Sequence, residues 1–327
     1  MAPNKDNTGW MSNLAGRDVA PLKRETLQDL IDSRPFFEEI ADITDLPDLA
    51  EWDEIAIWQR EDHTVKVEVY VPHGSPPFPS LMHFHGGGWS TGSTRTERKH
   101  AMTISAKGYV VFNVGYGLAP EHPFPAALED CVYATRWASE NAVRYGGDRN
   151  GLVLEGGSAG ANLAAATMLA LTSDVDIEHG DRRRQAVEVG AMVLLYGIFD
   201  LTELLLEPGS NVGPAELWTR AYLGPQFSAR LKNPLVSPVF SESLSAFPPT
   251  YLACGSTDSL LNHTLKMTHQ LARAGVPVTL SVLEGEDHAF AKTPNNEAGA
   301  IAWERIDAWL MQRLLTDPTE QNRRRDG

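Results

Sequence analysis

The fold is decided by the stretch Leu152-Val153-Leu154-Glu155-Gly156-Gly157-Ser158-Ala159-Gly160-Ala161-Asn162-Leu163. Its first three residues are apolar and predict a strand, and the alanine-rich run 161–166 predicts a helix. Between them, Gly156–Gly160 fits the pattern G-x-S-x-G, which needs this strand–turn–helix context. Small neighbours let the strand and the helix approach each other. The sequence therefore predicts that Ser158 is a nucleophile at a sharp turn, and the alternative is a glycine-rich turn without chemistry.

Strand and helix patterns alternate along most of the chain. We expect strands at 65–71, 81–84, 109–114, 152–154, 191–195, 250–253 and 278–283. We expect helices at 22–33, 97–107, 126–144, 159–172, 260–274 and 296–314. Alternation of this kind predicts an α/β fold, with a mainly parallel sheet and helices on both faces. The later strands are mostly continuous apolar runs, as expected of strands covered on both faces. In strand 65–71 valines alternate with polar residues, which predicts a half-exposed antiparallel edge.

The same patterns predict how the chain is divided. Residues 1–47 form an N-terminal helical segment, and residues 48–327 form the α/β domain. The stretch at about 201–235 breaks the alternation, because it carries leucines and aromatic residues among turn residues. We expect it to be an insertion above the sheet, where a lid would lie.

A second glycine-rich motif, His85-Gly86-Gly87-Gly88-Trp89, follows the strand 81–84. Without Cβ atoms, its backbone N–H groups can approach a ligand oxygen, and such donors stabilise the oxyanion of acyl transfer. One of the last two glycines, with the N–H of Ala159, would form the oxyanion hole. No Lys-Ser/Thr follows the glycines, which excludes a P-loop. His83 and His85 could be read as a metal pair, but no third ligand accompanies them, so no metal is expected.

The acid and base of a triad are expected in the order Ser, Asp or Glu, His. Asp258 follows the strand 250–253, and His288 follows the strand 278–283. Both would lie at carboxyl ends of strands, where such a sheet places its site. His288 would take the Ser158 proton as general base, and Asp258 would fix its tautomer. The competing acids by position are Asp200, Glu286 and Asp287.

Together the motifs resemble the hormone-sensitive-lipase-like family of α/β-hydrolases over about residues 50–315. His85–Trp89 is similar to its His-Gly-Gly-Gly signature, Gly156–Gly160 to its Gly-x-Ser-Ala-Gly elbow, and 116–127 to the segment that links the two. The resemblance implies the α/β-hydrolase fold, with an eight-stranded sheet and a helical cap. It also implies carboxylesterase activity and no cofactor. The oxyanion donors that it implies are Gly87, Gly88 and Ala159.

The chain departs from this family in three places. Gly157 stands where the family usually has Asp or Thr, and Gly117 stands where Arg is usual after the tyrosine. Ser259–His263 replaces the Asp-Glu that tends to follow the triad acid. These changes leave the triad intact and affect the support beneath the loops.

An acyl or alcohol pocket is expected between the cap and the strand ends. Its candidate lining residues are Trp10, Phe36, Phe37, Trp89, Trp218 and Tyr222. Because no long apolar lid is evident, the hypothesis is hydrolysis of a short, soluble ester. Hydrolysis of a lactone, amide or carbamate on the same triad stays open, since all pass through the same oxyanion. A non-catalytic small-molecule receptor of the same fold is the alternative from a different class.

Composition and net charge limit the kinds of partner that the protein is expected to bind. The chain of 327 residues is 42% hydrophobic, which suits a large core, and its formal net charge of -15 disfavours nucleic acid and anionic lipid as partners. We find no bilayer-spanning apolar run and no apolar segment behind the polar N-terminus, so we expect no membrane partner and a cytoplasmic location. The two cysteines, Cys131 and Cys254, are expected to be buried free thiols. A homodimer is possible.

Overall fold

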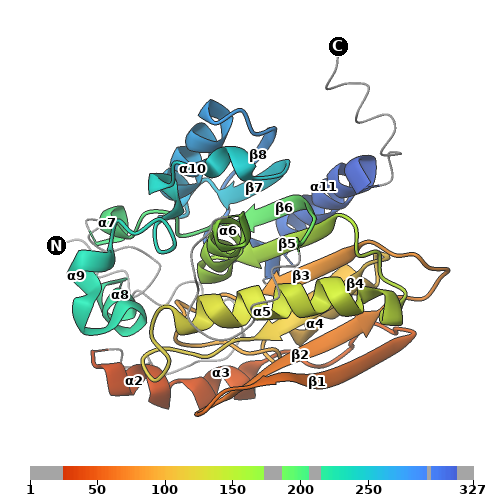
Figure 1. Cartoon of the computed structure of the whole chain (residues 1–327), viewed down its shortest axis with the longest axis horizontal. Helices are drawn as coiled ribbons and strands as arrows, with labels where there is room; N and C mark the ends of the chain where they lie inside the picture. Colours follow the sequence, from red (N-terminus) through yellow and green to blue (C-terminus); the bar gives the residue numbers. More distant parts are fainter. Residues whose placement is uncertain (1–24, 173–185, 206–214, 293–295, 315–327) are drawn as a thin grey trace.

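The computed structural model describes residues 25–172, 186–205, 215–292 and 296–314 (Figure 1). Its centre is an eight-stranded sheet with the strand order β1-β2-β4-β3-β5-β6-β7-β8. The strands are β1 (Glu51–Gln59), β2 (Thr64–Val71), β3 (Ser80–Phe84), β4 (Val110–Gly115), β5 (Leu152–Gly157), β6 (Val189–Leu195), β7 (Thr250–Gly255) and β8 (Val278–Leu283). From β4 to β8 all neighbours pair in parallel, whereas β2 is antiparallel to both β1 and β4. The predicted α/β fold with its mainly parallel sheet is confirmed.

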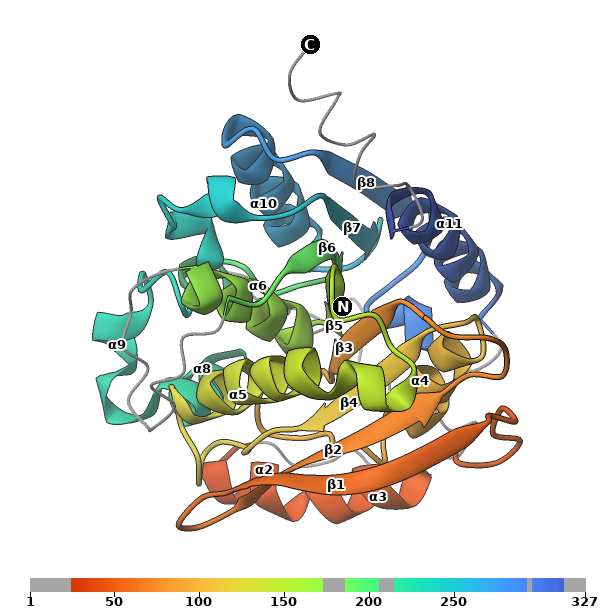
Figure 2. The ribbon, with the colours of Figure 1, turned by 45° about the vertical axis from the view of Figure 1, so that its right-hand side comes forward.

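Helices cover both faces of the sheet (Figures 1 and 2). The main ones are α4 (Arg98–Ser105), α5 (Ala126–Asn141), α6 (Ala159–Thr172), α10 (Leu261–Arg273) and α11 (Glu297–Leu314). One hydrophobic cluster joins α5, α6 and α10 to their face of the sheet, and a second joins α4 and α11 to the other face. The helices predicted after residue 90 are all confirmed, with ends within about three residues of their expected bounds. Short 3-10 turns complete the description: η1 (Ala142–Tyr145), η2 (Gly224–Gln226), η3 (Pro238–Phe240), η4 (Leu244–Ala246) and η5 (Phe290–Lys292).

The prediction for strand 65–71 was right about its direction and wrong about its place. This strand, β2, lies inside the sheet, and the edge is formed by β1, which the sequence analysis did not find. Strand β1 was missed because its first four residues are charged or aromatic and all exposed, so it lacks the alternation of a half-buried strand. Charged residues suit an edge strand because they discourage pairing with another chain.

The expected exposed face of β2 is also mostly buried. Lys66 is exposed, but Glu68 and Tyr70 are fully buried. Arg98 of α4 forms an ion pair with the Glu68 carboxylate, which also accepts a hydrogen bond from the Tyr70 hydroxyl. A buried carboxylate is tolerated when it is paired in this way. The polar residue at the centre of this alternation, Glu68, therefore belongs to a buried ion pair and does not face solvent.

Two groups of short helices lie in the N-terminal segment and in the insertion. In the N-terminal segment these are α2 (Leu27–Asp32), which begins with a capping box at Thr26, and α3 (Arg34–Ile40), which carries Pro35 in its first turn. In the insertion they are α7 (Leu201–Leu204), α8 (Ala215–Leu223) and α9 (Phe227–Arg230). Trp10 and the predicted helical residues before 25 lie outside the described residues, and the domain division at residue 47 stays a prediction.

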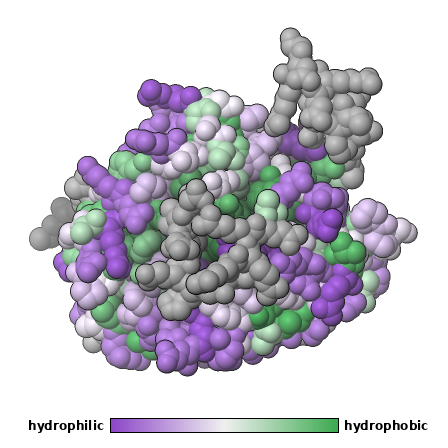
Figure 3. Space-filling model, viewed as in Figure 1, coloured by the Kyte–Doolittle hydropathy of each residue, from purple (hydrophilic) through white to green (hydrophobic). Residues whose placement is uncertain are grey.

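The described part of the chain agrees with two further expectations. Cys131 and Cys254 are both buried and free, as predicted. No helix in the described ranges is both long and apolar enough to cross a bilayer. Figure 3 shows that the described surface in that view is mostly hydrophilic, with apolar residues confined to small areas.

Candidate active site

Ser158 lies at the turn between β5 and α6. Its φ of +58° is in the left-handed region, which a residue with a side chain adopts at a cost of about 1–3 kcal/mol. The turn is held because the Ser158 N–H donates to the Leu195 carbonyl at 2.9 Å, while the Ser158 carbonyl accepts from the Asn162 N–H at 3.2 Å. These bonds join the turn to β6 and to the first turn of α6.

Glycines make this turn possible. A Cβ atom on Gly160 would lie 1.9 Å from the carbonyl oxygen of Phe84, and one on Gly156 would lie 2.5 Å from the backbone of Gly160. Both contacts are with backbone atoms, so a neighbouring side chain cannot relieve them by moving. The small residues of the motif are therefore required by the close approach of α6 to β3 and β5.

The structure brings the three predicted triad residues into one chain of contacts. The Ser158 Oγ lies 3.0 Å from Nε2 of His288, and Nδ1 of His288 lies 2.9 Å from Oδ2 of Asp258. The three side chains are nearly buried, at 4–7% exposure. This geometry allows His288 to accept the Ser158 proton while its other nitrogen donates to Asp258.

The loops that carry Asp258 and His288 are joined to each other. The Thr257 N–H and hydroxyl both donate to the Glu286 carbonyl, at 3.0 and 2.7 Å, and the Gly285 N–H donates to the Ser256 hydroxyl. A Cβ atom on Gly255 would lie 2.2 Å from that same Glu286 carbonyl. The loops after β7 and β8 are thus packed in a fixed relation.

Asp258 is held in its ionised form. Burial by itself would raise its pKa, but the imidazole of His288 and the N–H of Leu260 lower the pKa below its usual value. The Leu260 N–H donates to Oδ1 at 2.8 Å, which leaves Oδ2 for His288. The competing acid Asp200 has different partners, because it caps α7 and pairs with Lys266.

The glycine motif after β3 lies next to Ser158. Gly87 and Gly88 have φ of +110° and +60°, and both line the same cavity as Ser158 and His288. A Cβ atom on Gly87 would lie 2.2 Å from the Thr91 carbonyl, and one on Gly88 would lie 2.6 Å from the Trp218 ring. Ala159 opens α6 directly after Ser158. Gly87 and Gly88 thus line the cavity beside Ser158, and Ala159 is its neighbour in the chain.

Arg34 of α3 holds this glycine loop from the N-terminal side. Its guanidinium donates to the carbonyls of Ser90 and Ala119, at 2.8 and 2.9 Å, and forms an ion pair with Glu121. The Ala119 N–H in turn donates to the Trp89 carbonyl. Sequence analysis did not single out Arg34, because a lone arginine on a short helix carries no motif.

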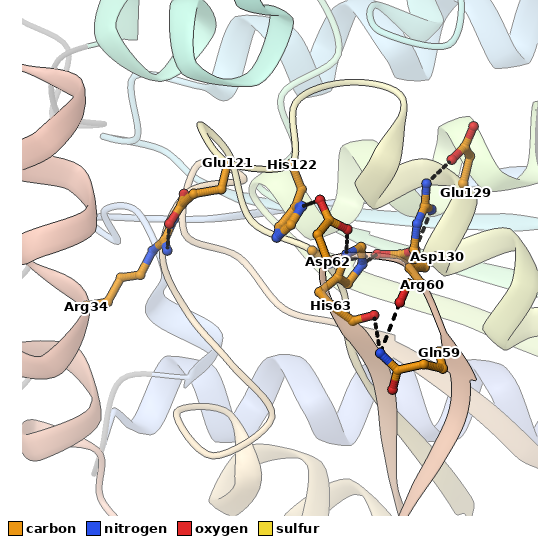
Figure 4. A network of polar contacts seen from close by, with 10 residues as sticks. Arg34, Gln59, Arg60, Asp62, His63, Glu121, His122, Glu129 and Asp130 are labelled. Atoms are coloured by element: carbon orange, nitrogen blue, oxygen red, sulfur yellow. Dashed lines mark hydrogen bonds and ion pairs between the residues drawn. The ribbon is translucent and has the colours of Figure 1, made fainter.

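The departure at Gly117 is explained by the network in Figure 4. A Cβ atom at position 117 would lie 2.8 Å from Nε2 of His63, so a larger residue would require the His63 ring to move. The Gly117 N–H donates to Asp130, which also contacts His63 at 2.8 Å and pairs with Arg60 at 2.9 Å. The hairpin between β1 and β2 therefore supplies the cation beside Asp130.

The departure at Gly157 has a similar cause. A Cβ atom there would lie 2.8 Å from the ring of Tyr196, which has a positive φ of +40° at the end of β6. The Tyr196 ring packs edge to face on His288, with 5.1 Å between ring centroids, and lines the cavity. Tyr196 was not predicted as a site residue.

A cavity of about 450 Å³ opens beside Ser158. Of the predicted lining residues, Phe37 and Trp218 line it. Phe36, Trp89 and Tyr222 do not, and the last two are fully buried and stack on each other at 4.3 Å between centroids. Their stacking packs the glycine loop against α8.

The cavity also contains polar residues that the sequence analysis did not assign to the site: His83, Glu97, His100, Glu155 and Lys292. His83 does not pair with His85, whose Nδ1 contacts the Gly86 carbonyl. It lies instead with His100 and Glu155, and the three have possible ligand atoms within 4.8 Å of one another. No sequence motif could have found this group, because its members come from β3, α4 and β5.

Comparison with known proteins defines the class. The family model described as alpha/beta hydrolase fold matches residues 81–292, and the chain belongs to this family. The match confirms the expected fold and the resemblance that the motifs indicated.

Several individual relatives are named as esterases. The chain is 30% identical over 242 residues to an arylesterase of Saccharolobus solfataricus, which covers 72% of this chain and 75% of that protein. It is 31% identical over 235 residues to the carboxylesterase NlhH of Mycobacterium tuberculosis, over 66% and 68% of the two chains. Among solved structures, a hyperthermophilic esterase from the archaeon Pyrobaculum calidifontis superposes with a TM-score of 0.76 at 26% identity, over 92% of this chain and 95% of that one.

Proposed function

We propose that this protein is a serine carboxylesterase in which Ser158 attacks the ester carbonyl and forms an acyl-enzyme. The observation that carries the proposal is the continuous contact from Ser158 through His288 to Asp258, beside two glycines in the left-handed region. His288 takes the serine proton and returns it to the leaving alcohol, and water then repeats the cycle on the acyl group. The N–H groups of Gly87, Gly88 and Ala159 stabilise the oxyanion. The relatives named as esterases support the reaction class.

The substrate proposed from the size of the cavity is a short ester, because 450 Å³ is at the small end of ligand pockets. Trp218 and Phe37 would contact it. The acidic chain and the absence of an apolar lid in the sequence support a substrate in solution. A cytoplasmic location and a homodimer stay predictions.

The proposal is tested by Ser158→Ala, with the exposed Ser245→Ala as matched control. We expect Ser158→Ala to lose hydrolysis of 4-nitrophenyl acetate and covalent labelling by a fluorophosphonate, with an unchanged melting temperature. The control should keep both. Hydrolysis that persists in Ser158→Ala would contradict the mechanism, and a wild type that neither labels nor turns over would favour the receptor. A panel of esters, lactones and amides separates the acyl-transfer reactions that share this triad.

A further inference from the structure

The cavity beside Ser158 continues between α4 and α11, which cover the same face of the sheet (Figure 2). The floor of this part is formed by His83 and Glu155, which are direct partners on the neighbouring strands β3 and β5. Its walls carry Glu97, His100 and Lys292. We call these five residues the polar recess.

The floor of the polar recess has two polar atoms that make no hydrogen bond with the described residues, although one of them, Nε2 of His83, lies 3.8 Å from the Glu97 carboxylate. Nδ1 of His83 contacts Oε2 of Glu155 at 2.5 Å, but Nε2 of His83 and Oε1 of Glu155 have no hydrogen bond within the described part of the chain. The two side chains are buried, at 2% and 0% exposure. Buried polar atoms nearly always make hydrogen bonds, so a ring nitrogen and a carboxylate oxygen that make none on a cavity wall point to a ligand group that bonds to both.

Charge limits what this ligand can be. Burial opposes ionisation of Glu97, but Lys292 lowers its pKa to about 2. Burial likewise opposes a charge on His83, but Glu155 raises the His83 pKa above its usual value. Burial lowers the pKa of His100 to about 3, so this side chain is neutral at pH 7. Acidic and basic side chains therefore contact one another across the recess, and this arrangement favours a ligand without net charge.

We propose that the polar recess binds a hydroxyl group of the substrate, so that the ester carries a hydroxylated acyl or alcohol chain. His83 has a carboxylate near each ring nitrogen, Glu155 at Nδ1 and Glu97 at Nε2, and this arrangement favours its imidazolium form. Its Nε2–H then donates to the hydroxyl oxygen, and the hydroxyl donates to Oε1 of Glu155. Because Glu155 precedes Ser158 by three residues, the hydroxyl lies roughly 10 Å from the reacting serine along the strand direction. An alkyl chain would leave both polar atoms without a hydrogen bond, which is how a polar site rejects an analogue that lacks the hydroxyl. This proposal rests on the proposed esterase function.

Binding of alcohols to the whole protein provides the first test. Dissociation constants are measured by calorimetry for 1-hexanol and 1,6-hexanediol, and for the corresponding pairs with four and eight carbons. We expect the diol to bind at least about fivefold more tightly at one of these lengths. An apolar pocket gives the opposite order, because the second hydroxyl must be desolvated. Tighter binding of the alkanol at every length would overturn the proposal without any variant.

Variants then test whether the preference for the diol arises at His83 and Glu155. The double variant His83→Phe with Glu155→Leu removes both charges together, so neither is left buried without a partner. We expect it to bind the alkanol more tightly than the diol, whereas Lys107→Met, a change elsewhere on the same cavity wall, should keep the wild-type order. If the double variant melts below the assay temperature, Glu155→Gln replaces it and should reduce the diol preference. A preference unchanged by loss of Glu155 would overturn the proposal.

Turnover identifies which half of the ester carries the hydroxyl. We compare kcat/KM for 4-nitrophenyl 6-hydroxyhexanoate with the hexanoate, and for 6-hydroxyhexyl acetate with hexyl acetate. A rise of at least about fivefold in one pair assigns the acyl or the alcohol side. No rise in either pair would contradict the proposal. A diol preference in a protein that hydrolyses no ester would contradict the esterase function and not the recess.

Discussion

Asp258→Asn tests how His288 is made into a base. In the wild type, Oδ1 of Asp258 accepts from the Leu260 N–H at 2.8 Å and Oδ2 faces Nδ1 of His288 at 2.9 Å. The Asn oxygen would keep the Leu260 bond, so its NH₂ group would face His288. Nδ1 must then be an acceptor, which places the imidazole proton on Nε2. That nitrogen faces the Ser158 Oγ at 3.0 Å and could no longer take its proton.

We expect a large loss of kcat, because catalysis needs the His288 tautomer that carries its proton on Nδ1. The corresponding change in a serine protease lowers kcat by about 10⁴-fold, which is about 5 kcal/mol at 1.36 kcal/mol for each factor of ten. We expect a loss of this order in kcat for 4-nitrophenyl acetate, measured at pH 7. The shape of the side chain is kept, so the melting temperature should change little.

Asp200→Asn is the matched control, since Asp200 also follows a strand and is fully buried. It caps α7 and pairs with Lys266, so its loss should lower stability with less than about a tenfold effect on kcat. The reasoning is refuted if Asp258→Asn retains more than a tenth of wild-type kcat, or if Asp200→Asn has the larger effect on kcat.

Three further predictions follow from contacts outside the triad. Gly160→Ala should lower the free energy of unfolding by at least about 3 kcal/mol in urea titration, because its Cβ meets the Phe84 carbonyl at 1.9 Å. Gly275→Ala is the control and should cost less, because no atom lies within 4 Å of the added Cβ. Arg34→Ala should lower kcat about tenfold by releasing the glycine loop, and equal losses in Arg95→Ala, whose exposed guanidinium lies 3.6 Å from Glu38, would contradict this. The hydrogen bond to Asp130 raises the pKa of His63, so its stabilisation is complete below the unfolded pKa of about 6.5 and is lost as pH rises through the folded value. The urea midpoint should therefore fall between pH 6 and pH 9 by more than it does in His63→Gln.

Most of the sheet could be predicted because its strands are covered on both faces and read as apolar runs. The exceptions are the strands whose environment differs. β1 is a charged edge, so no periodic signal marks it. β2 alternates in sequence, yet Arg98 buries its Glu68 from a helix thirty residues away. A contact between distant parts of the chain decides whether such a residue is buried, and the local sequence pattern carries no information about that contact.

The residues near Ser158 also fall into a group that the sequence indicates and a group that it does not. Ser158, Gly87 and Gly88 lie in motifs whose backbone geometry demands glycine or a small neighbour, so spacing alone locates them. Phe36, Trp89 and Tyr222 were chosen for aromatic character, but aromatic side chains serve core packing as readily as ligand contact, and these three do not line the cavity. The polar recess could not be predicted, because its residues meet only through the register of β3 and β5 and the packing of α4.

The two glycines that depart from the family pattern, Gly117 and Gly157, affect the surroundings of the expected nucleophile and leave its turn unaltered. At each position the space beside the backbone is filled from elsewhere in the chain, by His63 at Gly117 and by Tyr196 at Gly157. The elbow itself is unchanged by this exchange, because its φ and its backbone contacts depend on Gly156 and Gly160. The cavity is affected directly, because Tyr196 contacts His288 and is one of the residues that line it. We therefore expect specificity to depend on β6, α4 and the recess, and reactivity to depend on the turn at Ser158.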